Sequence, residues 1–264
     1  MIEVKELHVT FGAGTPLENH ALRGINLQIP EGQFVTVIGS NGAGKSTFLS
    51  SLAGEVIADT GSIAIDNQDV TRWPTNKRSA LVARVFQDPL AGTCESLSIE
   101  ENMALALKRG QRRGLSRSMK KEYKELFQER LSRLGLGLEK RLGDRMGLLS
   151  GGQRQAVSLL MATLQPMKIL LLDEHTAALD PKTAAFVLEL TRDIIAEQQL
   201  TALMVTHSMR QALDVGDRTL MLHEGNIAFD VQGDEREGLD VPDLLALFSR
   251  NKGEELSDDS LLLG

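Results

Sequence analysis

Apolar and polar residues follow two different periodicities along the chain, and the change between them divides it into three stretches. The stretch up to residue 87 contains short apolar runs rich in β-branched residues, such as "QFVTVIG" at 33–39, which are typical of buried strands. From about residue 98 to residue 164, apolar residues recur every three or four positions, which predicts helices. Buried-strand patterns return in "KILLLDE" and "TALMVTH". This order predicts an α/β core interrupted by an inserted helical segment.

Residues at the ends of these runs refine the predicted elements. Ser98 precedes two glutamates, an arrangement that predicts a helix N-terminus. A helical face in residues 118–136 ends where Gly135 and Gly137 interrupt it. Further helices are expected at 181–199 and 208–215, further strands at 1–11 and 218–225, a strand and turn at 60–70, and a strand at 81–89 that stops at Pro89.

The turn where the run at 33–39 ends is crowded with glycine, which weakens regular structure unless something compensates. It fits the pattern G-x-x-x-x-G-K-[ST] between a predicted strand and a predicted helix start, where backbone N–H groups form a site for nucleotide phosphates. Lys45 would reach the β- and γ-phosphates, the Ser46 hydroxyl would ligate Mg²⁺, and Thr47 would donate to the α-phosphate. The predicted nucleotide-binding residues here are Gly39, Ser40, Asn41, Gly42, Ala43, Gly44, Lys45, Ser46 and Thr47.

A second candidate site lies where "LLLDE" ends in two carboxylates. Ligands bind at the carboxyl ends of parallel strands in open α/β sheets, so both acids are expected at that edge. Asp173 would hold Mg²⁺ through water, and Glu174 would polarise the attacking water.

A third motif, "LLSGGQRQ", precedes a strongly apolar helix. A serine hydroxyl and bare glycine amides at a helix N-terminus form a second anion site, although the chain has a single P-loop lysine. Leu149 to Gln153 spell LSGGQ, and here the chain resembles the ATP-binding cassette (ABC) ATPases. Further residues match in the family's order: Phe11 as the adenine-stacking aromatic, Gln87 as the Q-loop glutamine, "AALD" at 177–180 as the D-loop and His207 as the switch histidine.

The resemblance spans nearly the whole chain and implies a fold. We expect an α/β P-loop NTPase (RecA-like) core with an N-terminal antiparallel β subdomain and an inserted α-helical subdomain. A single nucleotide-binding domain would occupy residues 1–264. Its core and β subdomain would comprise 1–87 and 168–264, and its helical subdomain, carrying LSGGQ, 88–167.

The resemblance also implies a mechanism that one chain cannot complete. In this family two cassettes pack head to tail, and each ATP lies between the P-loop of one and the LSGGQ of the other. Catalytic roles would fall to Glu174, His207 and Gln87, with Ser46, Gln87 and Asp173 at the Mg²⁺. The γ-phosphate held by the partner's P-loop would be bound by the signature residues Ser150, Gly151, Gly152 and Gln153.

One position departs from the family pattern. The family usually has proline after the catalytic glutamate, and this chain has His175. Two interpretations stay open: a tolerated loop residue beside the dimer interface, or a titratable donor near the γ-phosphate that makes activity pH-sensitive. "DEHTAALDPKTA" also resembles a subgroup of bacterial cassettes that accompany uptake permeases, some of them tryptophan or tyrosine systems.

Composition is ordinary for a globular protein and predicts no membrane span. Hydrophobic residues make up 42% and charged residues 25%, and no apolar run approaches the length that spans a bilayer. The N-terminus has no signal-peptide pattern, and the single cysteine, Cys94, suits a reducing compartment. A net charge of −7 argues against nucleic-acid binding. We interpret the acidic residues from Asp230 to Asp259 as solvated surface.

Together these features predict the ATP-hydrolysing subunit of an ABC transporter, an importer of a small solute such as an amino acid. Its expected partners are a second ABC ATPase subunit, as a homodimer, transmembrane permease subunits and an extracytoplasmic substrate-binding protein. It would lie at the cytoplasmic face of the cell membrane, attached through the permease. An ABC exporter or lipid-extraction ATPase, and a soluble non-transport ABC ATPase, remain alternatives.

Overall fold

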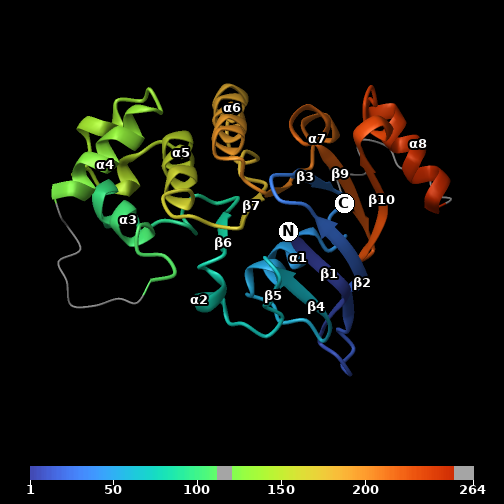
Figure 1. Ribbon diagram of the computed structural model, residues 1–264. Coiled ribbons are helices and arrows are strands. Elements are labelled where there is room, and N and C mark those ends of the chain that lie inside the picture. The colour runs from blue at the N-terminus through green and yellow to red at the C-terminus, as the bar shows by residue number, and fades with distance from the viewer. Residues whose placement is uncertain (112–120, 253–264) are drawn as a thin grey trace. The chain divides into compact units, whose positions relative to one another are not determined.

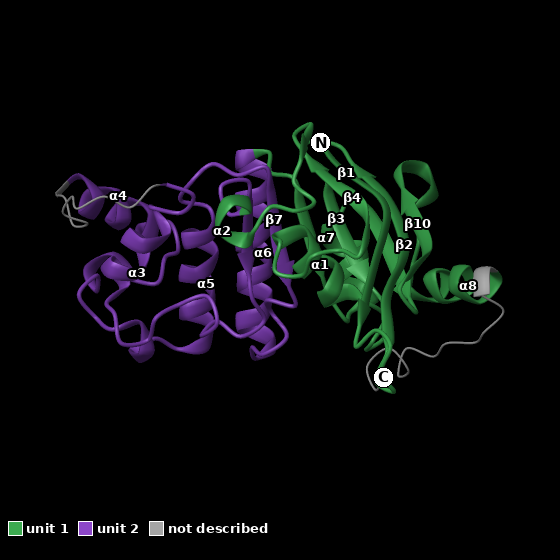
Figure 2. Cartoon of the chain, turned by 90° about the horizontal axis from the view of Figure 1, so that it is seen from below, with its two compact units in different colours: residues 1–78, 199–264 green, residues 79–198 purple. Residues whose placement is uncertain are grey.

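The chain folds into two compact units, each formed from its own set of strands and helices (Figures 1 and 2). The structure, a computed structural model, describes residues 1–111 and 121–252. One unit comprises Met1–Arg78 together with the described residues from Gln199 onward, and the other comprises Ser79–Gln198. The subdomain limits expected near residues 87 and 168 remain a prediction.

The first unit contains an antiparallel sheet in the strand order β2-β1-β4-β5. Apolar residues on one face of β1 are buried between polar neighbours, because successive side chains of a strand point to opposite faces. The strand β2 begins at Asn19. The strands are β1 (Ile2–Phe11), β2 (Asn19–Ile29), β4 (Thr60–Ile65) and β5 (Gln68–Asp69).

The same unit contains the buried strand β3 (Phe34–Ile38), which has parallel neighbours on both sides. These neighbours are β8 (Ala202–Val205) and β9 (Arg218–His223), and β9 pairs in antiparallel fashion with β10 (Asn226–Gln232). All five residues of β3 are buried, as expected of a strand covered on both faces. Its helices are α1 (Lys45–Ala53), α2 (Thr75–Arg78), α7 (Met209–Val215), α8 (Val241–Lys252) and a 3-10 turn at Gly233–Glu235.

Helix α8 lies within the run that we interpreted as acidic surface, and sequence analysis missed it. Its acidic residue Asp243 is exposed, but Leu244 and Phe248 are fully buried against apolar side chains of β10 and α7. The run is therefore solvent-exposed at Asp243, as interpreted, but apolar side chains within the same run are buried. Figure 1 shows α8 beside β10.

The second unit joins a parallel strand pair to a group of helices. Strands β6 (Val82–Val85) and β7 (Ile169–Asp173) pair in register from Val82–Ile169 to Val85–Leu172. Helix α3 begins at a capping box between Ser98 and Glu101, as its sequence predicts. The helices are α3 (Ile99–Ala106), α4 (Lys121–Ser132), α5 (Gly151–Ala162) and α6 (Pro181–Gln198), with 3-10 turns at Leu138–Lys140 and Met146–Leu148. Residues 118–120 of the predicted helix lie outside the described residues.

A buried arginine closes the C-terminal end of α1, the helix that begins in the glycine-rich loop. The Arg78 side chain is inaccessible to solvent and donates to the carbonyl oxygens of Ser51 and Leu52 in the last turn of α1. It also donates to three carbonyls of residues 70–73. Because the last carbonyls of a helix have no partner within the helix, Arg78 satisfies them and fixes the position of α1.

In the described part of the chain, no helix has the length and apolar character needed to cross a membrane.

Candidate functional site

The glycine-rich loop between β3 and α1 has the conformation that its sequence predicts. Gly39, Gly42 and Gly44 have φ values of 146°, 78° and 101°, which are accessible mainly to glycine. A Cβ atom at Gly39 would lie 2.2 Å from the Leu222 carbonyl oxygen, and one at Gly44 would lie 2.5 Å from that of Ala21. The loop therefore needs glycine at these two positions for space as well as for backbone angle.

Lys45 starts α1, and its side chain folds back over the loop. Its Nζ donates to the carbonyl oxygens of Gly39 at 2.6 Å and Ser40 at 3.0 Å. This cation and the N-terminal amides of α1 give the loop the positive character that an anion requires. Ser46 is exposed in the first turn and Thr47 is partly buried beside it.

The carboxyl end of β8 lies next to that of β3, because Val37 pairs with Val205. The amide of Thr206 donates to the Val37 carbonyl at 3.1 Å, so His207 leaves β8 at the same edge as the glycine-rich loop. Phe11 ends β1 opposite Asn19 and its ring is 45% exposed, which leaves a face available for stacking. The first unit thus carries Phe11, the loop residues and His207.

The second unit brings the two predicted acids and Gln87 to one strand edge. Since Val85 pairs with Leu172, the segments that follow β6 and β7 leave the pair together. Gln87 is exposed, Asp173 is partly buried and Glu174 is 9% exposed. The Gln155 amide of α5 donates to the Phe86 carbonyl at 3.1 Å, which ties the Gln87 segment to the signature helix.

Asp173 has a cationic partner that sequence analysis did not identify. Arg84 Nη2 donates to Asp173 Oδ2 at 2.5 Å, and the two side chains are only 11% and 13% exposed. A hydrogen bond between an arginine and a carboxylate in such surroundings fixes the orientation of the Asp173 side chain.

Predicted Mg²⁺ ligands are Ser46, Gln87 and Asp173, and their chemistry fits the ion. A hydroxyl, an amide and a carboxylate provide the oxygen donors that Mg²⁺ prefers. With Oδ2 of Asp173 held by Arg84, the carboxylate keeps Oδ1 for a water of the ion. Within residues 1–111 and 121–252 there is no cluster of three metal-binding acids, histidines or cysteines. A metal held through one carboxylate and substrate phosphates needs no such cluster.

His175 is buried in the second unit. It is 1% exposed, and its Nε2 lies 2.9 Å from the Thr191 hydroxyl of α6. Burial lowers the pKa of His175 to about 4, so the ring is neutral near pH 7. The ring fills an interior position, so His175 is more than a tolerated loop residue. The interpretation as a donor near the γ-phosphate does not fit a ring whose Nε2 contacts Thr191.

The signature residues form the N-terminus of α5. Ser150 Oγ accepts from the Gln153 amide at 3.3 Å, and Gln153 Oε1 accepts from the Ser150 amide at 3.1 Å, which makes a capping box. Since Ser150 Oγ is an acceptor here, its hydrogen can be donated to an anion. A Cβ atom at Gly152 would lie 1.9 Å from Thr183 Cγ2, so only glycine allows this packing.

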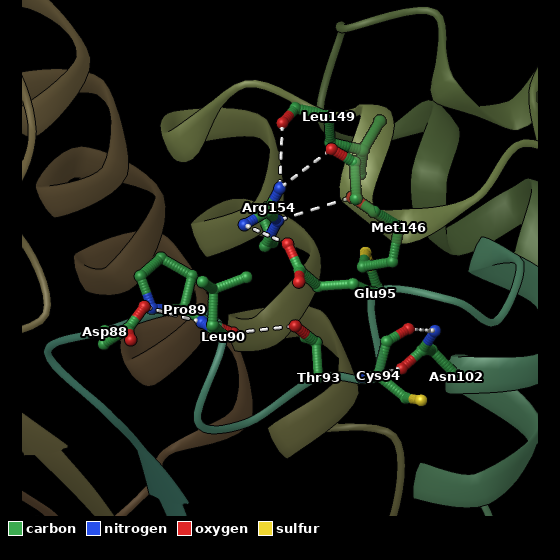
Figure 3. Close-up of polar contacts among 11 residues, drawn as sticks. Asp88, Pro89, Leu90, Thr93, Cys94, Glu95, Asn102, Met146, Leu149 and Arg154 are labelled. Atoms are coloured by element: carbon green, nitrogen blue, oxygen red, sulfur yellow. Dashed lines mark hydrogen bonds and ion pairs between the residues drawn. The ribbon is translucent and has the colours of Figure 1, made fainter.

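Arg154 holds the segment that leads into the signature (Figure 3). Its guanidinium donates to the carbonyl oxygens of Met146, Gly147 and Leu149 at 3.1 to 3.3 Å, and it pairs with Glu95 at 3.7 Å. These contacts fix the backbone on the N-terminal side of Ser150. Sequence analysis missed Arg154, although its position directly after LSGGQ points to it.

A family model described as ABC transporter matches residues 22–177, more than half of the chain. The chain belongs to the ABC transporter ATP-binding family. A tyrosine transport ATP-binding protein of Clostridioides difficile (strain R20291) is 42% identical over 94% of this chain and 98% of that protein. A thiamine import ATP-binding protein of Salmonella choleraesuis (strain SC-B67) is 34% identical over 84% of this chain and 89% of that protein.

Solved structures confirm the predicted fold class. An ATP-binding cassette solved as a dimer in a post-hydrolysis state, bound to ADP and phosphate, is 30% identical with a TM-score of 0.75. The match covers 88% of this chain and 98% of that one. The chain is thus an ABC cassette with the P-loop NTPase fold, and it is an ATP-binding ATPase of this family.

Proposed function

We propose that this cassette powers an ABC importer of a small solute, an aromatic amino acid such as tyrosine. The observation that carries the proposal is the 42% identity to a tyrosine transport ATP-binding protein, which extends over nearly the full length of both chains. The His175 stretch that resembles amino-acid cassettes supports the same substrate class.

In the proposed nucleotide site, ATP is held by its phosphates and its base. The amides of the glycine-rich loop and Lys45 bind the phosphates, and Thr47 donates to the α-phosphate. The exposed ring of Phe11 stacks on adenine, an interaction that contributes about 1–3 kcal/mol in nucleic-acid sites. When bound, Mg²⁺ neutralises charge on the phosphates, and Ser46, Gln87 and Asp173 would hold it.

In the proposed hydrolytic step, Glu174 accepts the proton of the attacking water. A carboxylate at the end of a buried strand is held in place, so it can orient that water toward the γ-phosphorus. His207 lies at the same strand edge as the glycine-rich loop and donates to the γ-phosphate as charge develops on it. Gln87 is the third catalytic residue of this proposal.

Two chains complete each site in this proposal. In this proposal the capped N-terminus of α5 and the glycine-rich loop each bind phosphate. They belong to different units of the chain. Ser150, Gly151, Gly152 and Gln153 of one subunit would bind the γ-phosphate held by Lys45 of a second, identical subunit. Hydrolysis then removes these contacts and opens the dimer.

The proposed assembly includes permease subunits and an extracytoplasmic substrate-binding protein, with this cassette at the cytoplasmic face of the cell membrane. Within the cassette, residues 88–167 would act as the helical subdomain that receives the permease, and residues 1–87 and 168–264 as the core. The order of the predicted motifs along the chain supports this division.

Transport by a reconstituted complex tests the proposal. The cassette, its permease and its binding protein are assembled in liposomes, and uptake of labelled tyrosine is measured with Mg-ATP. We expect ATP-dependent uptake that Glu174→Gln abolishes and excess unlabelled thiamine does not reduce. ATP-dependent efflux would favour an exporter, and a cassette that neither binds the permease nor supports transport would favour a non-transport ATPase.

A further inference from the structure

Glu174 has a backbone conformation that its own chain does not favour. Its φ is +46°, in the left-handed region that residues with a side chain rarely adopt. Such a conformation persists only where the surrounding structure holds it, and it is frequent at active sites. Contacts of the residues beside Glu174 therefore contribute to how its carboxylate is aimed.

Two backbone hydrogen bonds shape turns within the loop after β7. The amide of Ala177 donates to the Glu174 carbonyl at 2.9 Å, and the amide of Leu179 donates to the Thr176 carbonyl at 3.2 Å. Each of these two bonds joins residues of the loop itself.

The His175 side chain attaches this loop to α6. Thr191 lies 16 residues farther along, is fully buried and donates its own hydroxyl hydrogen to the Val187 carbonyl at 2.7 Å. A hydroxyl has one hydrogen to donate, so the 2.9 Å contact to His175 is made by an Nε2–H group that donates to Thr191 Oγ1. The direction of this bond requires hydrogen on Nε2, and in the neutral ring that burial favours this is the Nε2–H tautomer.

We propose that His175 is a positioning residue for Glu174: its hydrogen bond to Thr191 fastens the loop to α6 and so aims the carboxylate for hydrolysis. The inference rests on the proposed role of Glu174 as the group that activates water. The backbone of Glu174 is fixed on its amino side by the buried strand β7 and on its carboxyl side by this bond. Without this bond, the left-handed conformation loses one of the contacts that hold the loop against the interior.

Thr191→Val is the sharpest variant, because it keeps the side-chain shape and removes the acceptor. We expect kcat for ATP to fall about ten- to a hundredfold, while KM and the affinity for ATP stay within about twofold. Thr191→Ser, which keeps the hydroxyl, should restore most of kcat. Thr163→Val is the matched control, because Thr163 also donates to carbonyls of its own helix but has no such histidine partner. It should leave kcat unchanged.

Two further variants keep the test decisive. In the His175→Leu/Thr191→Val pair, two apolar side chains replace the bonded pair, so no polar group is left unsatisfied if the single variant folds poorly. We expect this pair to fold and to keep the low kcat; a wild-type kcat in the pair or in Thr191→Val would overturn the inference. Glu174→Gln separates the two claims: full hydrolysis there refutes the role of Glu174 itself, whereas loss of hydrolysis there with a normal Thr191→Val refutes only the positioning role.

Discussion

At the scale of single residues, His175 makes the stability of the protein depend on pH. Burial lowers the pKa of its imidazole to about 4, whereas an imidazole in the unfolded chain titrates near 6.5. Between these values the unfolded state binds a proton that the folded state excludes. The stabilisation is therefore complete above pH 6.5 and is lost as the pH falls toward 4.

The expected effect is measurable by urea denaturation of wild type and His175→Gln at pH 7 and pH 5. Over this interval the free energy of unfolding of the wild type should fall by about 2 kcal/mol more than that of the variant, since one proton is linked to unfolding. The variant is the control for every other titrating group. Equal losses in the two proteins would show that the imidazole is not buried in the neutral form.

The partners of Asp173 and His175 could not be predicted from the spacing of residues along the sequence. The glycine loop and the two acids are local patterns, so their positions could be read from the chain. The Arg84–Asp173 pair joins residues 89 apart and depends on the register of β6 against β7. The contact between His175 and Thr191 likewise requires the packing of α6, which a single sequence does not specify.

At the scale of elements, the glycine-rich loop depends on how α1 is held at its far end. Arg78 satisfies the last carbonyls of α1 and those of a neighbouring segment, and burial lowers its pKa. We expect Arg78→Met to lower the free energy of unfolding by about 3 kcal/mol or more, because it leaves several buried acceptors without a donor. Thermal or urea denaturation measures the loss.

Arg72→Met is the control for that change. Arg72 also donates to backbone carbonyls, of Ala58 and Asp59, but its side chain is exposed, so water can replace it. Its loss should cost less than about 1 kcal/mol. If the two variants were equally stable, the role assigned to Arg78 would be wrong.

Hydrophobic periodicity predicted most of these elements because each strand or helix buries one regular set of positions. Helix α8 was not predicted because the charged residues around it were given more weight than the helical spacing of its apolar residues. Leu244 and Phe248 are four residues apart, the spacing of one helical face, and Asp243 caps the Asp240 amide at 2.9 Å. Both signals were present in the sequence.

At the scale of the whole molecule, the central claim is that ATP joins two copies of this chain. The glycine-rich loop and the signature helix, the two proposed phosphate-binding sites, belong to different units of one chain. If ATP lies between the loop of one copy and the signature of the other, it stabilises the dimer by mass action. Blocking hydrolysis should then preserve the dimer.

The most direct measurement is the mass of Glu174→Gln by light scattering with saturating Mg-ATP. We expect the mass to double with ATP and to remain that of one chain with ADP, because the γ-phosphate supplies the joining contacts. Adding Ser150→Arg to the same variant should leave ATP binding intact and prevent the dimer, since a bulky side chain then occupies the signature site. A Glu174→Gln protein that binds Mg-ATP and keeps the mass of a single chain would contradict the account.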